Sequence, residues 1–169
     1  HSNVSITLPA VSGFTLGLGM TDGATSAADG SQWGVTYAMD AGSMGITVAY
    51  ASASDGSNND QSSAGVTVTA GDAKVVAATN KKTASSVTHT ATSIGASYAV
   101  SSTLSVQAYT GTTDKSDVAA YEVKDTGIGL TYTITPGLSL SITSNDFSGK
   151  GGTSDESGTR TVVALDATF

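Results

Sequence analysis

The residues of this chain that could take part in covalent chemistry are few and scattered. The sequence has no cysteine and two histidines, His1 and His89, which excludes thiolate nucleophiles and cysteine-based zinc sites. His89 lies in a Thr-rich stretch, and the sequence identifies no partner that would complete a zinc site or a Ser-His-Asp triad with it. The glycine pairs do not match a phosphate-binding loop. The sequence therefore predicts no enzymatic activity and no cofactor.

The charged residues favour cations as partners and disfavour nucleic acid. Seven Lys and Arg against 14 Asp and Glu give a formal charge of −7, which repels DNA phosphates. The acidic stretches 22–29 and 55–60 superficially suggest calcium ligands. They lack the spacing and the terminal bidentate Glu of an EF-hand loop, so we interpret them as hydrated surface loops.

The elements that must position any site are β-strands. The longest apolar runs cover only a few residues, far short of the roughly 20 that a transmembrane helix requires. Residues 13–21 instead alternate with period two, because Phe14, Leu16 and Leu18 fall on one face and Thr15 and Gly17 on the other. The same alternation recurs in residues 32–40, 44–50, 94–100, 128–134, 138–142 and 162–169. It predicts an all-β chain of about eleven strands, in one domain over residues 1–169.

The connections between these strands indicate where a membrane would lie. Tight turns are expected at residues 41–43, 71–73, 101–102 and 136–137, and longer polar loops at 22–31, 54–62, 81–91, 112–125 and 148–157. Short and long connections thus alternate, and the charges gather in the loops. This asymmetry is typical of an antiparallel transmembrane β-barrel.

The aromatic residues of the strands fall near the ends of the expected apolar band. Tyr37, Tyr98 and Tyr132 precede tight turns, whereas Trp33 and Tyr50 lie next to long loops. Two aromatic girdles at a pair of membrane interfaces require such positions, and Phe169 at the end of the last strand is assigned to the same girdles.

Two segments resemble those of a known family. Residues 4–20, VSITLPAVSGFTLGLGM, resemble the strand, Pro-containing turn, Ser-Gly-Phe and strand signature of Gram-negative porins, particularly those of alphaproteobacteria. Residues 161–169, TVVALDATF, resemble the last strand of outer-membrane proteins, whose terminal Phe is read by the barrel-assembly machinery. The resemblance implies an outer-membrane pore for passive diffusion of small hydrophilic solutes and cations, surrounded by lipid and assembled as a homotrimer.

The resemblance also implies that the chain is one portion of a larger barrel. General porins have sixteen strands, so these eleven would be the C-terminal part of such a barrel, incomplete at its N-terminal side. The face opposite the apolar one would then line the pore. The residues that we assign to this lining are Thr36, Asp40, Gln107, Thr131, Arg160 and Asp166. Arg160 would form the basic side of the transverse electric field that selects permeants in the pore, or else would lie in solvent at the rim of the barrel.

A secreted structural protein is the main alternative. A Gly-, Ser- and Thr-rich module of a surface filament, adhesin or S-layer would also have low charge, no cysteine and long polar loops. The two interpretations differ in the fate of the apolar face. A filament module would bury Leu16, Ile46, Leu130 and Leu165 in its own core, whereas a barrel would expose them to lipid.

Overall fold

The computed structural model describes residues 3–22, 29–57, 59–116, 121–151 and 155–168 of the 169-residue chain. These residues form eleven strands in chain order. The strands are β1 (Asn3–Thr7), β2 (Phe14–Thr21), β3 (Gly30–Ala41), β4 (Met44–Ser54), β5 (Asn59–Ala70), β6 (Ala73–Ala84), β7 (Val87–Ala99), β8 (Leu104–Lys115), β9 (Glu122–Thr135), β10 (Leu138–Lys150) and β11 (Glu156–Ala167). Within the described residues there is no helix of the length and hydrophobicity needed to cross a membrane.

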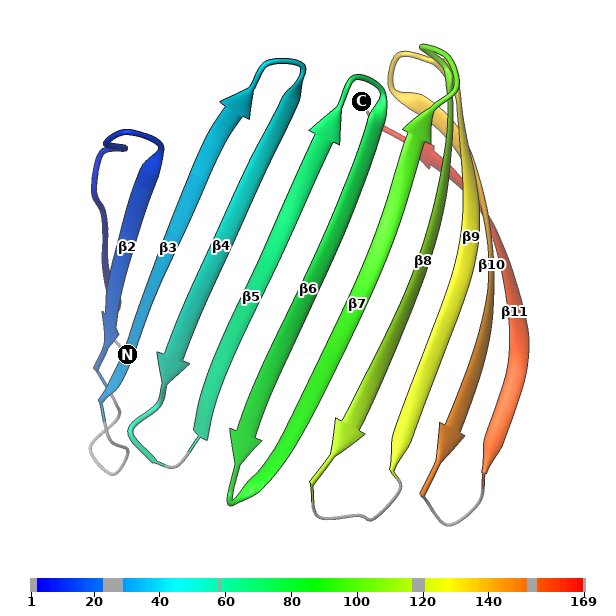
Figure 1. Ribbon diagram of the computed structural model, residues 1–169. Helices are drawn as coiled ribbons and strands as arrows, with labels where there is room; N and C mark the ends of the chain where they lie inside the picture. Colours follow the sequence, from blue (N-terminus) through cyan, green and yellow to red (C-terminus); the bar gives the residue numbers. More distant parts are fainter. Residues whose placement is uncertain (1–2, 23–28, 58, 117–120, 152–154, 169) are drawn as a thin grey trace.

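All eleven strands belong to one antiparallel sheet, in which each strand pairs with its neighbours in sequence. Figure 1 shows that the sheet curls, so that β9 to β11 turn away from the plane of β2 to β7. In the described part of the chain, β1 pairs only with β2 and β11 only with β10, so both are edge strands. The predicted all-β fold with eleven antiparallel strands is therefore confirmed.

The two faces of the sheet differ in residue type and in exposure. Because residues paired across a strand pair share a face, the register places Leu16, Ile46, Leu130 and Leu165 together on one face. Leu130 is 37% exposed and Leu165 65% exposed, and no hydrophobic residue among the described ones is buried. The apolar face of the described strands thus has no core of its own, which disfavours the filament alternative.

The opposite face is the inside of the curl. Every buried residue in the described ranges belongs to it, namely Gly19, Gly127, Gly129 and Asn145. Along β9, the residues of the apolar face are exposed from Lys124 to Tyr132, whereas the alternating residues of the other face are less exposed. Side chains crowd on the inside of a curved sheet, so we call the apolar face convex and the other face concave.

The strict alternation of short and long connections is wrong at one hairpin. Residues 81–91, expected to be a loop, instead complete β6 and begin β7, which are joined by a tight turn at Ser85 and Ser86 with φ of 50° and 72°. The expected loops at 54–62, 112–125 and 148–157 are also shorter, because the strands continue into polar sequence. The error arose because polar strand ends that extend beyond an apolar band look like loops in a sequence.

The register also shows how far the strands are tilted. A row of lateral neighbours that begins at Leu18 on β2 passes through Trp33 on β3 and ends at Lys150 on β10. On β3 the apolar residues of this face stop at Trp33, whereas on β10 those of the same face stop at Ile142, eight residues nearer the tight-turn end than Lys150 and seven strands on. The shift is thus about one residue per strand. One residue per strand, about 3.4 Å against an interstrand spacing of about 4.8 Å, corresponds to a tilt of about 35°. Transmembrane barrels have tilts of roughly 35–45°.

Candidate pore wall and membrane belt

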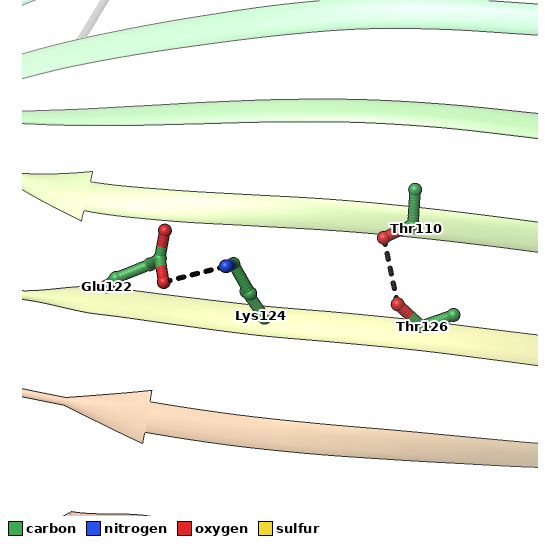
Figure 2. A network of polar contacts seen from close by, with 4 residues as sticks. All are labelled: Thr110, Glu122, Lys124 and Thr126. Carbon is green, nitrogen blue, oxygen red and sulfur yellow. Dashed lines mark hydrogen bonds and ion pairs between the residues drawn. The ribbon is translucent and has the colours of Figure 1, made fainter.

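The convex face carries a slanted apolar belt with a polar border. On β9 the belt contains Ile128, Leu130 and Tyr132. Directly beyond Ile128, the Thr110 and Thr126 hydroxyls lie 2.9 Å apart across β8 and β9, and Lys124 Nζ lies 3.1 Å from Glu122 Oε1. Figure 2 shows these four residues following one another toward the loop end of the two strands. The change from aliphatic to charged side chains within a few residues places the outer edge of the belt there.

The tyrosines assigned to a girdle follow the same slant. The row that starts at Tyr37 on β3 reaches Ile94 on β7 and Thr126 on β9. Tyr98 lies four residues beyond Ile94, four strands on, and Tyr132 lies six residues beyond Thr126, six strands on. All three tyrosines therefore lie at one height on strands that are tilted by one residue per strand.

The other aromatic residues of the belt contact one another across strands. The ring centroids of Trp33 and Tyr50, near the loop end, are 5.1 Å apart, and those of Phe14 and Tyr37 are 4.3 Å apart. Both separations are close to the usual range for stacked or tilted aromatic pairs. Phe169, assigned to the girdles from the sequence, lies outside the described residues.

The residues assigned to the pore lining all lie on the concave face. The register places Thr36, Asp40, Gln107, Thr131, Arg160 and Asp166 on it. They do not form one cluster, because Thr36 and Asp40 are on β3 whereas Arg160 and Asp166 are on β11. Arg160 is exposed and lies in a strand rather than in a connection.

Several large concave side chains lie flat against glycines of the next strand. A Cβ atom added to Gly127 would be 2.6 Å from the ring of its neighbour Tyr109, and one added to Gly158 would be 3.0 Å from the ring of Phe147. Gln107 covers Gly129 in the same way. Such cross-strand pairs stabilise a sheet at a glycine. They also hold large side chains along the wall, away from the space that the sheet encloses.

One concave pair is both buried and hydrogen-bonded. Asn145 is 7% exposed, and its Nδ2 donates to Asp125 Oδ1 at 3.1 Å. Sequence reasoning missed Tyr109, Asp125, Asn145 and Phe147. The signal for them was present, because extending the alternation from Val106, Ile128 and Ile142 toward the loops places all four opposite the apolar residues.

The acidic excess of the chain is not on the concave face. The concave residues of the described strands include four bases, Lys74, Lys82, Lys115 and Arg160, and four acids, Asp40, Asp125, Glu156 and Asp166. The described residues between strands include five acids and no base, namely Asp22, Asp29, Asp55, Asp72 and Asp155. The wall is therefore balanced and the connections are acidic. Within the described ranges, no three His, Cys, Asp or Glu side chains gather as a metal site.

Asp55 organises the connection between β4 and β5. Its Oδ1 accepts hydrogen bonds from the backbone N–H of Ser57 at 2.8 Å and of Asn59 at 3.2 Å, and its Oδ2 accepts one from the Asn59 side-chain amide. The Asn59 side chain and then the Ser57 amide stabilise the carboxylate and lower the pKa of Asp55 below its ordinary value of 3.8.

The sheet has an apolar convex face, a polar concave face and tilted antiparallel strands. The sequence that forms it matches one family profile. The profile describes Gram-negative porins and matches residues 1–152. The chain belongs to the Gram-negative porin family. It is an outer-membrane protein by that membership, as the sequence resemblance implied. No curated protein is significantly similar to this porin in sequence.

Solved outer-membrane proteins share the fold of this porin. The anion-selective porin from Comamonas acidovorans is 17% identical with a TM-score of 0.73, and the match covers 99% of this chain and 59% of that one. OccAB2 of Acinetobacter baumannii is 12% identical with a TM-score of 0.73, covering 99% and 54%. The trimer form of Vibrio cholerae OmpT is 14% identical with a TM-score of 0.60, covering 98% and 61%. The chain thus spans less than two thirds of these structures.

Proposed function

We propose that the barrel to which these eleven strands belong forms a water-filled channel for passive diffusion of small hydrophilic solutes and ions. The observation that best supports this proposal is the division of the sheet into two faces. The convex face is apolar and has no core, and the concave face consists of Gly, Ser, Thr and a few charged residues. Lipid matches the first face and water the second. Diffusion through such a lumen needs neither a cofactor nor covalent chemistry, so we propose a channel and not an enzyme.

We further propose that strands additional to these eleven close the barrel. The backbone groups of the edge strands β1 and β11 would otherwise remain unpaired in hydrocarbon, at several kcal/mol for each group. This chain spans between 54% and 61% of the three matched structures, so their remaining length corresponds to the strands that would close the barrel. A total of sixteen strands is carried over from the resemblance to general porins. We carry the trimeric state over from the trimer form of the Vibrio cholerae protein as part of this proposal.

We assign the lining of this lumen to the concave residues Thr36, Asp40, Gln107, Thr131, Arg160 and Asp166. Trp33, Tyr37, Tyr50, Tyr98 and Tyr132 would lie at the membrane interfaces, where amphipathic rings are favoured. A mild preference for cations would come from the acidic connections, since the wall itself is balanced. Such a preference weakens as salt screens the exposed carboxylates.

The channel is tested by reconstituting the full-length porin in planar bilayers. We expect stepwise conductance increases in KCl, and a reversal potential in a salt gradient that favours K⁺ and declines from about 0.1 M to 1 M ionic strength. A protein that inserts but conducts no ions would contradict the channel. A clear preference for Cl⁻ would contradict only the cation preference.

A further inference from the structure

Phe147 is an exposed aromatic residue on the polar face of the sheet. It lies on β10 and pairs laterally with Asp125 on β9 and Gly158 on β11, all on the concave face. Its side chain is 40% exposed. Contact of a large apolar surface with water is unfavourable, so the exposed part of this ring is available to an apolar group that comes from the lumen.

The ring of Phe147 is held along the wall by Gly158. A Cβ atom on Gly158 would be 3.0 Å from Cζ of Phe147 and 3.2 Å from Cε1. The glycine therefore makes room for the tip of the ring above β11, and the rest of the ring accounts for its exposure on the concave face. A planar ring can stack on the exposed part of this ring with a centroid separation of about 4.5–7 Å.

Arg160 supplies a charge next to this ring. It follows Gly158 by two residues on β11, so it shares the concave face, and its lateral neighbour is Asn145. Its side chain is exposed, and within the described residues it makes no ion pair. The guanidinium is permanently charged and its fork of N–H donors matches a carboxylate.

Two acids of the concave face, Asp125 and Glu156, lie near this guanidinium, and within the described residues neither forms an ion pair with it. Asp125 accepts a hydrogen bond from the side-chain amide of Asn145 at 3.1 Å, and Asn145 stands between Asp125 and Arg160 in the sheet. Phe147 and Arg160 are diagonal neighbours across β10 and β11. Such residues are about 7–8 Å apart, within reach of one small molecule when their side chains are long.

We propose that Phe147 and Arg160 form a subsite on the pore wall for small carboxylates that carry an aromatic ring. The guanidinium binds the carboxylate while the ring stacks on Phe147, and Asn145 keeps Asp125 in place beside them. This inference rests on the proposed channel, because the subsite faces solutes only if the concave face lines a lumen. It would lengthen the stay of aromatic acids relative to other permeants.

Single-channel recording on the full-length porin tests the subsite with three probes. Benzoate has the ring and the charge, acetate has the charge alone, and benzamide has the ring alone. We expect benzoate to interrupt the current for longer than either of the others. Phe147→Leu and Arg160→Gln should each shorten the benzoate interruptions about three- to tenfold, the usual range for one stacking or ion-pair contact.

Two matched variants serve as controls. Lys74→Gln removes a concave cation on β6, and Phe14→Leu removes an aromatic ring on the convex face of β2. Both should leave the benzoate interruptions unchanged. If Lys74→Gln shortens them as much as Arg160→Gln does, the effect comes from general charge and the subsite is refuted.

The subsite and the channel fail in different ways. Normal KCl conductance with benzoate interruptions no longer than those of acetate would refute the subsite and leave the channel intact. A protein without conductance would refute the channel. In that case saturation-transfer NMR on the wild-type protein in detergent decides whether benzoate binds, with acetate as competitor for the charge and Phe147→Leu as the variant that should abolish transfer.

Discussion

The concave face has two regions that differ in the size of their side chains. The small-residue wall, on β2 to β5, presents Gly17, Gly34, Ala49, Ala51, Ser63 and Gly65 around a hollow of about 560 Å³. The large-residue wall, on β8 to β11, presents Gln107, Tyr109, Asn145, Phe147 and Arg160. Both walls use glycine, but for different purposes. Gly17, Gly34 and Gly65 leave open space around this hollow, although Gly19 near the loop end of β2 is covered by the Gln32 side chain. On the large-residue wall, Gly127, Gly129 and Gly158 each receive a side chain from the neighbouring strand.

In the proposed channel, this difference would let one sheet combine width with selectivity. A wall of small residues gives a lumen its cross-section without any specific contact. A wall of large side chains laid against glycines offers aromatic and charged groups while obstructing less of the lumen than upright side chains would. We therefore expect conductance to fall where a substitution displaces a side chain from the wall into the lumen, and removal of the large side chains on β8 to β11 to alter which solutes stay.

The largest effect on stability is expected from a charge on the convex face, because both walls belong to the opposite face and only the convex face would contact lipid. Leu130→Lys places a charge in the convex belt, whereas Thr131→Lys places it on the adjacent concave position. The first should destabilise the folded porin by about 2–4 kcal/mol, and the second by much less. Urea unfolding of the porin in lipid vesicles measures both. Equal losses would mean that the two faces are not in different solvents.

A smaller effect is expected from the buried polar pair of the large-residue wall. Asn145→Leu removes the partner of Asp125 and should cost about 1–3 kcal/mol of unfolding free energy, because a partly buried carboxylate loses its donor. Ser63→Ala, on the small-residue wall, is the matched change and should be close to neutral. The comparison of walls fails if both variants unfold at the same urea concentration.

Adding a methyl group distinguishes the two uses of glycine. In Gly127→Ala the new Cβ would meet the Tyr109 ring at 2.6 Å, so the ring must move off the wall. We expect a loss of about 1 kcal/mol and a lower single-channel conductance. In Gly34→Ala the nearest atom is the Tyr50 carbonyl oxygen at 3.3 Å, which requires only a small adjustment. Unchanged conductance in Gly127→Ala would show that Tyr109 does not lie where the lumen is narrow.

The smallest effect concerns the connection at the loop end of the small-residue wall. The pKa of Asp55 is lowered, so the stabilisation from its hydrogen bonds with Ser57 and Asn59 is complete above its ordinary value of 3.8 and is lost as the pH falls through the lowered pKa. The backbone amide shifts of Ser57 and Asn59 in NMR spectra should follow this titration. Asp55→Asn should remove the titration, and its persistence in that variant would assign it to another carboxyl group.

The period-two pattern was sufficient to predict the sheet and its two faces. Leu16, Ile46, Leu130 and Leu165 were placed together from the sequence because a strand has only two sides and one side was consistently apolar. The ends of the strands were not predictable in the same way. Beyond the belt both sides become polar, so Lys81 and Thr90 were expected in a loop although they pair laterally in β6 and β7.

The lateral relations between strands were the other part that the sequence did not contain. Arg160 could be assigned to the concave face by parity alone. Its position diagonal to Phe147 depends on the register of β10 against β11, which no local pattern specifies. The contact of Phe147 with Gly158 depends on the same register, so this candidate subsite could not be recognised before the structure was known.

The uniform slant has a consequence for how such a sheet can change through evolution. The apolar segment of each strand lies about one residue nearer the tight-turn end, relative to the lateral pairing, than that of the strand before it. A duplicated hairpin would therefore fit at its new position only if its apolar segments moved along the strands by two residues. If the β8–β9 hairpin were exchanged with the β4–β5 hairpin, their apolar segments would be displaced from the membrane belt by about 14 Å along the strands. The hairpins of this sheet are therefore alike in shape but not interchangeable. Gain or loss of strands must be accompanied by substitutions that shift the apolar residues of the convex face along each strand.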